Sequence, residues 1–403
     1  MRAREAERGP PRARGSAPAR PALDRLGLLL AAIVGCALAL QPFALARPNR
    51  IAAAAPEFLW NALDPLRAGL AGAAFAAAAL LLAFRNPPRL RLAAAAAALL
   101  LLGLASGWSA RHLTPPGNAY IRVSPGGGAW LMLLAYALAV ADALARLRLS
   151  PLGRLGALGI AAAALVLLLW SGAWDPISVM REYASRADGF RRELRVHALL
   201  ALGSLAAAAI VGVPLGILCH RSPGLRGLVL GGLNLLQTIP SMALFGLLIV
   251  PLAWVAINLP GAAALGIAGI GPAPALIALV AYALLPVVSA TVTGLEAVPR
   301  AVRDAADGMG MTGRQRLLAV ELPLALPALL AGVRIVLVQN IGLAVIAGLV
   351  GGGGLGTFVF QGISQTATDL VLLGALPTVA MAFAAAIVLD ACVELSRGGG
   401  GAA

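Results

Sequence analysis

Residues 273–293 read APALIALVAYALLPVVSATVT and contain no charged side chain. An α-helix rises about 1.5 Å per residue, so an apolar stretch of roughly 20 residues can cross the hydrocarbon core of a bilayer. Lipid offers no water to unpaired backbone groups, and barrel strands are short and alternate in polarity. This stretch therefore indicates a transmembrane helix.

Similar apolar runs recur along the whole chain. Of its 403 residues, 60% are hydrophobic and 12% are charged, and the mean hydropathy is +0.89. A soluble globule could not bury that much apolar surface. About ten runs are long enough to span a membrane, at about 26–46, 66–84, 92–108, 129–147, 153–173, 197–218, 228–250, 273–293, 326–349 and 370–391. The sequence predicts an all-α polytopic membrane protein of about ten transmembrane helices.

The placement of arginines predicts the orientation. The tail before residue 26 is rich in Arg, and Lys and Arg favour the cytoplasmic side of a membrane. With the N-terminus in the cytoplasm, the even-numbered connections also face the cytoplasm, and they carry the compact basic clusters: Arg85, Arg89 and Arg91; Arg146, Arg148 and Arg154; Arg221 and Arg226; Arg300, Arg303, Arg314 and Arg316. The segment 174–196 is the exception, because it is external in this scheme but holds five arginines. We expect both termini in the cytoplasm.

The basic residues also exclude some functions. All 31 are Arg, and the net charge is +14. They form clusters between apolar spans, which is typical of membrane topology and not of a nucleic-acid-binding face. A nucleotide-binding P-loop needs a Lys to reach the phosphates, and this chain has none. Any ATP hydrolysis must come from a separate subunit.

The sequence shows no pattern typical of a catalytic or metal site. The cysteines and histidines are scattered, without a C-x-x-C pair or an H-E-x-x-H motif, at Cys36, Cys219, Cys392, His112, His197 and His220. We expect no enzyme activity, no metal and no cofactor bound by this chain.

The organisation changes near residue 174. We expect a disordered basic tail at 1–25, a five-helix membrane module at 26–173 and a polar external linker at 174–196. A second membrane module at 197–392 and a short cytoplasmic tail at 393–403 follow. The second module differs from the first because it places Pro, Gln, Asn and Gly at specific points inside its apolar runs.

One connection of the second module stands out, at Asp304 to Pro323, reading DAADGMGMTGRQRLLAVELP. Pro299 is tolerated near a helix start, and Gly310 can take a positive φ, which suits a sharp turn. Thr312 is a plausible cap of a second helix at about 312–321, which Pro323 is expected to end. The pattern predicts a pair of short amphipathic helices on the cytoplasmic face. An ordinary interfacial connection between two helices is the alternative.

This block closely resembles the EAA loop of ABC importer permeases, the cytoplasmic elbow on which an ATPase subunit acts. The resemblance implies a coupling loop within 296–325 whose residues are Asp304, Ala305, Ala306, Gly310, Met311, Arg314, Leu322 and Pro323. The family usually has Glu at the position of Asp304, which keeps the charge on a shorter side chain.

The resemblance extends over about residues 195–392 and points to a subfamily. The stretches Val213 to Gly216, Asn234 to Ala243 and Gly351 to Gly356 look like permeases of osmoprotectant importers, which handle glycine betaine, choline or carnitine. The additional N-terminal module is similar to that of the long-form permeases. The resemblance implies a five-helix type I importer core in the bacterial inner membrane. It also implies a partner ATPase that binds ATP and Mg, a second permease copy or paralogue, and an external substrate-binding protein.

Polar residues inside the apolar runs are candidates for the translocation path. Pro240 removes a backbone donor and is expected to break its helix, and interrupted helices at membrane depth are tolerated where they line a cavity. The candidates for the path are Gln237, Thr238, Pro240, Ser241, Gln339 and Asn340. Hydrogen bonding between helices is the alternative role for these side chains. Arg334 is expected to snorkel to the cytoplasmic edge, or otherwise to pair internally.

Two other functions remain open. An importer of another solute, such as an amino acid or a sulfonate, would share the coupling loop. An ion-coupled transporter usually needs acidic residues within the membrane, for which Asp142 and Asp390 are the candidates. Aromatic residues make up only 5% of the chain, and quaternary ammonium groups are usually bound in aromatic cages. We therefore expect the binding protein to select the substrate.

Overall fold

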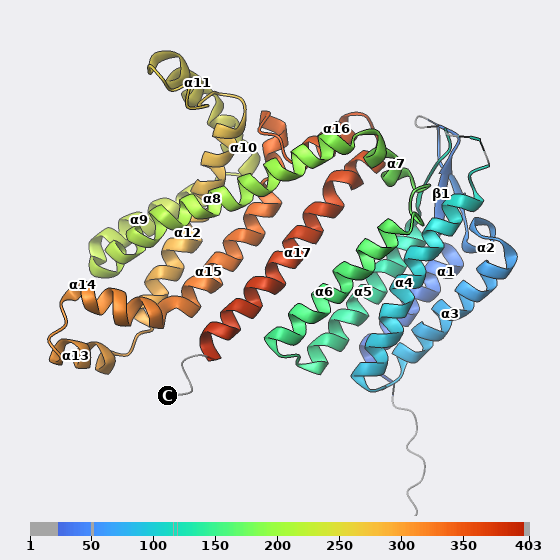
Figure 1. Ribbon diagram of the computed structural model, residues 1–403, viewed down its shortest axis with the longest axis horizontal. Helices are drawn as coiled ribbons and strands as arrows, with labels where there is room; N and C mark the ends of the chain where they lie inside the picture. The colour runs from blue at the N-terminus through green and yellow to red at the C-terminus, as the bar shows by residue number, and fades with distance from the viewer. Residues whose placement is uncertain (1–22, 50–51, 116, 119, 399–403) are drawn as a thin grey trace, which may run out of the picture. The chain divides into compact units, whose positions relative to one another are not determined.

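The computed structural model describes residues 23–49, 52–115, 117–118 and 120–398, and helices account for most of them (Figure 1). The chain divides into two compact units. Unit 1 comprises residues 1–45, 56–105 and 125–148, and unit 2 comprises residues 46–55, 106–124 and 149–403. The predicted basic tail lies outside the described residues up to residue 22, as does the end of the chain from residue 399.

Unit 1 is built on long helices with short connections. Its helices are α1 (Arg25–Leu40), α2 (Leu59–Ala62), α3 (Pro65–Ala83), the greater part of α4 (Pro88–His112) and α5 (Gly127–Leu147). Helix α1 packs against both α3 and α5. Three short strands, β1 (Ala44–Arg47), β2 (Ala55–Glu57) and β3 (Arg122–Pro125), form a sheet in the order β2-β1-β3, which the sequence did not indicate. Residues 46–47, 55 and 122–124 of these strands belong to unit 2.

A buried arginine ties the helices of unit 1 together at one end. The side chain of Arg91 is 0% exposed, and its Nη2 lies 2.9 Å from Asp24 Oδ2 and 3.3 Å from Asp142 Oδ2. Its Nη1 donates to the carbonyl oxygens of Leu82 at 2.8 Å and Phe84 at 3.1 Å. Arg91 therefore joins the starts of α1 and α4 to the ends of α3 and α5.

Unit 2 contains the remaining helices. They are α6 (Pro151–Trp170), α7 (Ser178–Ser185), α8 (Ala187–Arg221), α9 (Pro223–Thr238), α10 (Ser241–Leu247), α11 (Ile249–Asn258), α12 (Pro272–Glu296), α13 (Arg300–Gly308), α14 (Gly313–Arg316), η1 (Leu317–Glu321), α15 (Leu322–Leu343), η2 (Ile346–Val350), α16 (Gly356–Ser364) and α17 (Thr368–Gly398). Helix α12 contacts α8 and α15, and α15 in turn contacts α17. Helix α11 has no buried residue and stands clear of the other helices of this unit (Figure 1).

Glycines allow the central helices of unit 2 to approach closely. A Cβ atom on Gly216 of α8 would lie 2.5 Å from Thr291 Cβ of α12, and one on Gly332 of α15 would lie 2.4 Å from Ala290 Cβ of α12. Membrane helices gain stability from such contacts because small residues let the backbones pack tightly. Helix α12 is therefore held between α8 and α15 by contacts that require glycine.

The all-α polytopic prediction is confirmed. Within the described residues, nine helical segments are long and apolar enough to cross a membrane. The first predicted span is shorter than expected, because α1 has 16 residues and ends at Leu40. The predicted span at 228–250 is wrong as a single helix, since α9 ends at Thr238 and a separate apolar segment follows at Ser241–Asn258.

The polar segment at 174–196 is largely helical. It contains α7 and the first ten residues of α8, which begins at Ala187. At the other end of unit 2, α17 continues through the predicted tail as far as Gly398. The predicted domain boundaries at 174 and 196 stay predictions.

Candidate coupling loop and polar sites of the helical core

The coupling loop turns sharply at Gly310. Helix α13 ends in hydrogen bonds from the Met311 amide to the Ala306 carbonyl at 3.2 Å and from the Gly310 amide to the Asp307 carbonyl at 2.9 Å. These two bonds, with Gly310 at φ +78°, form a Schellman motif. The predicted glycine turn and the start of α13 after Pro299 are both confirmed.

The second half of the loop begins with the predicted cap. The Thr312 hydroxyl accepts from the Gln315 amide at 3.4 Å, and Gln315 Oε1 accepts from the Thr312 amide at 2.8 Å. This reciprocal pair is a capping box, which satisfies two backbone donors at the helix start. Thr312 therefore fixes the direction in which the chain leaves the turn.

Arg316 joins the two halves of the loop. Its Nη1 donates to Asp307 Oδ1 at 2.6 Å, and its Nε donates to Glu321 Oε1 at 3.1 Å. Glu321 is only 5% exposed. The sequence does not indicate this clip, because Arg316 and Glu321 are five residues apart and helical pairing favours spacings of three or four. The π-helical η1 between them makes the wider spacing possible.

The prediction that Pro323 ends the second helix is wrong. Residues Gly313–Leu343 form one helical stretch that contains both Pro323 and Pro327. A proline ring normally clashes with the carbonyl four residues earlier. Here the Leu322 amide bonds to the Leu317 carbonyl, five residues back, so the π turn opens the backbone just before Pro323. The helix can therefore pass from the coupling loop into the core without a break.

The residues of the coupling loop divide into exposed and buried positions. Asp304, Ala305 and Gly310 are exposed, as are Arg314 and Pro323, whereas Met311 and Leu322 are partly buried. Ala306 is only 1% exposed and packs inward. The loop thus presents an outer face with small residues and with charges of both signs, Asp304 and Arg314.

The predicted break at Pro240 is confirmed. Helix α9 ends at Thr238, and Pro240 stands just before α10. The freed carbonyl of Ile239 accepts a hydrogen bond from the Tyr282 hydroxyl, and Gln237 Nε2 donates to the Tyr282 carbonyl at 3.0 Å. Tyr282 of α12 therefore bonds twice to the chain just before Pro240, once through its hydroxyl and once through its carbonyl.

Two other candidates for the path, Asn340 and Thr238, also make hydrogen bonds. Asn340 is 0% exposed, and its Nδ2 donates to Ser204 Oγ of α8 at 2.7 Å. Thr238 bonds within its own helix, to the Leu235 carbonyl at 2.7 Å. Ser241 and Gln339 are partly buried. Gln237 and Asn340 thus make the interhelical bonds that the alternative role requires, and their role in a path stays a prediction.

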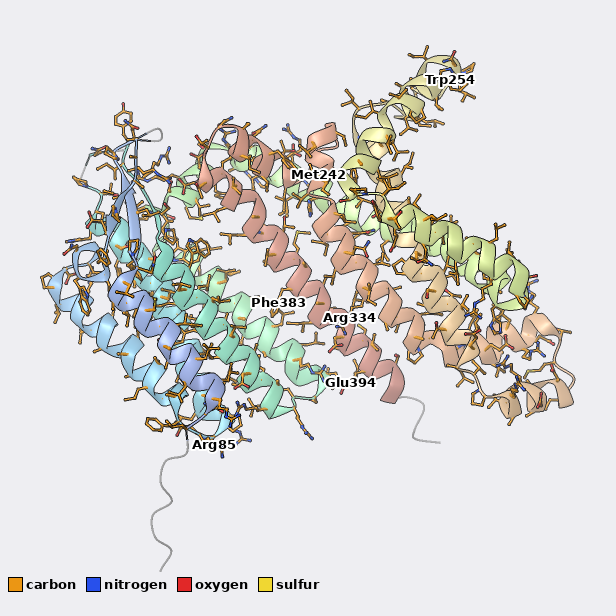
Figure 2. The ribbon with its side chains drawn as sticks, turned by 180° about the vertical axis from the view of Figure 1, so that it is seen from behind. Arg85, Met242, Trp254, Arg334, Phe383 and Glu394 are labelled. Carbon is orange, nitrogen blue, oxygen red and sulfur yellow. The ribbon has the colours of Figure 1, made fainter. Side chains whose placement is uncertain are left out.

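Arg334 forms the internal ion pair that was the alternative to snorkelling, and its side chain is 44% exposed. Its position relative to the membrane edge stays a prediction. Its guanidinium contacts Asp390 of α17, which also accepts from Arg154 of α6 at 2.7 Å. Arg154 reaches Glu394 as well, at 2.5 Å. Figure 2 shows Arg334 and Glu394 on neighbouring helices. Since Asp142 pairs with Arg91, both acidic candidates for ion coupling are held by arginines.

These features define a class of protein: a polytopic membrane protein with an exposed elbow between two of its long helices. Among the described residues, no group of three His, Cys, Asp or Glu side chains could hold a metal ion. Residues 212–397 match the family described as binding-protein-dependent transport system inner membrane component. Residues 24–180 match the N-terminal domain of the ABC transporter permease YehY.

The chain is similar to curated permeases over its second half. It is 44% identical over 194 residues to the osmoprotectant import permease protein OsmW of Salmonella typhimurium. These residues make up 48% of this chain and 83% of that relative. It is 37% identical over 209 residues to the glycine betaine/carnitine/choline transport system permease protein OpuCD of Bacillus subtilis, covering 51% and 84%. The chain therefore belongs to the family of ABC transporter permeases of binding-protein-dependent transport systems.

Among solved structures, the chain resembles a chain of the MetNI methionine ABC transporter in an inward-facing conformation. The sequence identity is 24% and the TM-score is 0.43, over 52% of this chain and 96% of that chain.

Proposed function

We propose that this chain is the transmembrane subunit of an importer that moves an osmoprotectant, glycine betaine or a related quaternary ammonium compound, into the cytoplasm. The identity to permeases named for such compounds supports the substrate class. The observation that carries the proposal is the coupling loop, a rigid elbow with Asp304 and Ala305 exposed beside the turn at Gly310.

The coupling loop fits a partner that pushes on it. Three devices stiffen it: the Schellman motif, the capping box and the Arg316 clip. A stiff surface transmits a displacement to the helix that follows, whereas a flexible one would absorb it. We assign the exposed face to an ATPase subunit that binds ATP and Mg, because a chain without Lys cannot form a P-loop.

The remaining partners follow from the same proposal. A second permease copy or paralogue completes the membrane part, and an external binding protein selects the substrate. The coupling loop then faces the cytoplasm together with both termini, in agreement with the arginine clusters of the even-numbered connections. The path would run beside the broken helix at Pro240 and the polar positions of α15, lined by Gln237, Thr238, Ser241, Gln339 and Asn340.

The coupling role is tested by Gly310→Asp, with Gly189→Asp as the control. Gly310 has φ +78°, and the new carboxylate would stand on the proposed docking face. Gly189 lies near the start of α8, has open space around it, and accepts a carboxylate at a helix N-terminus. We expect Gly310→Asp to abolish ATPase association and uptake while the protein stays in the membrane. Normal ATPase association and normal uptake in Gly310→Asp would contradict the proposal.

The substrate class is tested by uptake of radiolabelled glycine betaine into proteoliposomes that hold the permease, its ATPase and its binding protein. We expect uptake that requires ATP and is competed by choline or carnitine. Uptake competed by an amino acid or a sulfonate instead would assign the other importer class. Counterflow in vesicles holding the permease alone, without ATP, would favour the ion-coupled alternative.

A further inference from the structure

Helix α8 holds the end of α15 that lies farthest from the coupling loop. Three polar residues of α8, at spacings of four and seven, lie along one face of the helix: Glu193, His197 and Ser204. His197 Nε2 lies 3.0 Å from the Ile341 carbonyl, and Ser204 bonds to Asn340. Because a carbonyl can only accept, the His197 ring donates from Nε2.

The segment after α15 folds into a tight glycine turn, Gly351–Gly354. Gly351, Gly353 and Gly354 have φ angles of +72°, +75° and +83°, which other residues rarely adopt. A Cβ on Gly353 would lie 3.0 Å from Glu193 Oε2, and one on Gly354 would lie 3.2 Å from His197 Nδ1. The turn therefore lies directly on α8, at the end of unit 2 opposite α13 and α14 (Figure 1).

One charged hydrogen bond joins the glycine turn to α8, and directly after the turn the buried Leu355 belongs to a cluster against which Phe190 and Leu194 of α8 pack. The Gly354 amide donates to Glu193 Oε2 at 2.7 Å, and the Glu193 side chain is 12% exposed. Its other oxygen, Oε1, lies 3.3 Å from Nε of Arg192, whose side chain is 72% exposed. Water can therefore reach the edge of this contact, whereas the neighbouring His197 is 0% exposed.

The two contacts differ in how readily they can open. The His197 contact is enclosed, so opening it would leave buried polar groups without partners. The Glu193 contact lies at the border of solvent, where water can replace the Gly354 amide. Between them, the short helix η2 packs Ala347 and Val350 into the cluster that also holds Leu200 of α8. Opening of the Glu193 bond would thus free Gly353 and Gly354 locally, while η2, Leu355 and the end of α15 stay packed.

We propose that Glu193 is a positioning residue whose hydrogen bond to Gly354 latches the glycine turn against α8, and that opening this latch is a step of the transport cycle. The proposal rests on the importer function proposed above. The latched turn keeps the external end of the core closed while no loaded binding protein is present. The coupling loop lies at the start of the helix Gly313–Leu343, and the glycine turn follows the end of that helix after η2, so a movement of the helix can couple the two.

The test compares three variants in the reconstituted importer of permease, ATPase and binding protein. Glu193→Ala removes the acceptor, Glu193→Gln keeps an amide oxygen that can accept from Gly354, and Asp188→Ala removes an exposed carboxylate from the same helix. Asp188 is 98% exposed and pairs only with Arg191 at 2.8 Å among the described residues. It therefore serves as the matched control for charge and for helix stability.

In Glu193→Ala, we expect ATPase activity without binding protein to rise roughly fivefold and uptake per ATP to fall by a similar factor. Loss of a hydrogen bond to a charged group shifts the latched population by about tenfold or more. Glu193→Gln should restore most of the coupling, and Asp188→Ala should match the wild type. A residue that only stabilised the fold would lower both activities together and leave uptake per ATP unchanged.

Hydrogen exchange gives a readout that needs no transport. Exchange at the Gly354 amide should speed up in Glu193→Ala by about tenfold or more, with little change at Ile341 and its neighbours. Unchanged uptake per ATP in Glu193→Ala, or an equal loss in Glu193→Gln, would overturn the latch and leave the importer function intact. Absence of uptake in the wild type would instead refute the importer function.

Discussion

Arg91 shows how a membrane protein can bury an arginine. Its guanidinium contacts two carboxylates and two carbonyl oxygens, and the Arg91 side chain is 0% exposed. A buried charge without partners costs free energy, so Arg91 and its two carboxylate partners stabilise one another. Two residues earlier on the same helix, Arg89 is exposed and makes no comparable contact within the described residues.

Replacing Arg91 should therefore destabilise unit 1 strongly. Arg91→Met leaves Asp24 and Asp142 with less neutralisation, and removing one partner of a buried ion pair costs about 3–5 kcal/mol. Arg89→Met should stay within about 0.5 kcal/mol of the wild type. Thermal unfolding of the purified protein in detergent measures both. Equal melting temperatures for the two variants would contradict the structural role of Arg91.

Gly310 can be tested against a second glycine of the same loop. Both Gly310 and Gly313 have open space where a Cβ would stand, but only Gly310 has a positive φ. A left-handed conformation costs a residue with a Cβ about 1–2 kcal/mol. Gly310→Ala should weaken ATPase binding by about tenfold, Gly310→Asn should weaken it less, and Gly313→Ala should bind normally. Equal affinities for Gly310→Ala and Gly313→Ala would show that the turn does not shape the docking face.

At the scale of helices, the contact between α8 and α12 depends on small residues. A Cβ on Gly216 would overlap the branched Cβ of Thr291, which cannot rotate away. Gly216→Ala should cost about 1–3 kcal/mol through overpacking. Gly227→Ala on α9, where a Cβ meets no atom, should be neutral or stabilise by up to about 1 kcal/mol. The unfolding midpoints of the two variants test this, and a Gly216→Ala protein as stable as Gly227→Ala would contradict it.

Most helices could be predicted from the sequence because length and apolarity alone decide whether a segment can span lipid. The break at Pro240 was also predictable, since proline removes a backbone donor. The same rule failed at Pro323, where a π turn between Leu317 and Glu321 makes room for the ring. The Arg316 clip accompanies that turn, and the sequence pattern indicates neither of them.

The candidate sites were predictable to a similar degree. The turn at Gly310 and the cap at Thr312 follow from local backbone chemistry, so both could be predicted from the sequence. Partners far apart in the chain were missed. Examples are Tyr282 at the break after α9, Glu193 on the glycine turn, and Asp390 beside Arg334. Such pairs form only once the helices are packed, and apolar periodicity carries no information about them.

At the scale of the whole molecule, the arginine distribution predicts which connections face the cytoplasm. The test uses single cysteines in a background lacking Cys36, Cys219 and Cys392, and a maleimide that cannot cross the membrane. Ala264→Cys, between α11 and α12, should react in intact cells, whereas Arg85→Cys, between α3 and α4, should react only after permeabilisation. Both positions are exposed. The opposite labelling pattern would invert the proposed orientation.

The helix Gly313–Leu343 has 31 residues, a length of about 46 Å, and it packs closely on α12 at two places. At one place Gly332 faces Ala290, and at the other Ala325 and Ala328 face Gly294. A rod that is held on its support at two places cannot pivot about either of them. A displacement applied at the coupling loop would therefore move this helix together with α12, and would reach the far end without a change of direction.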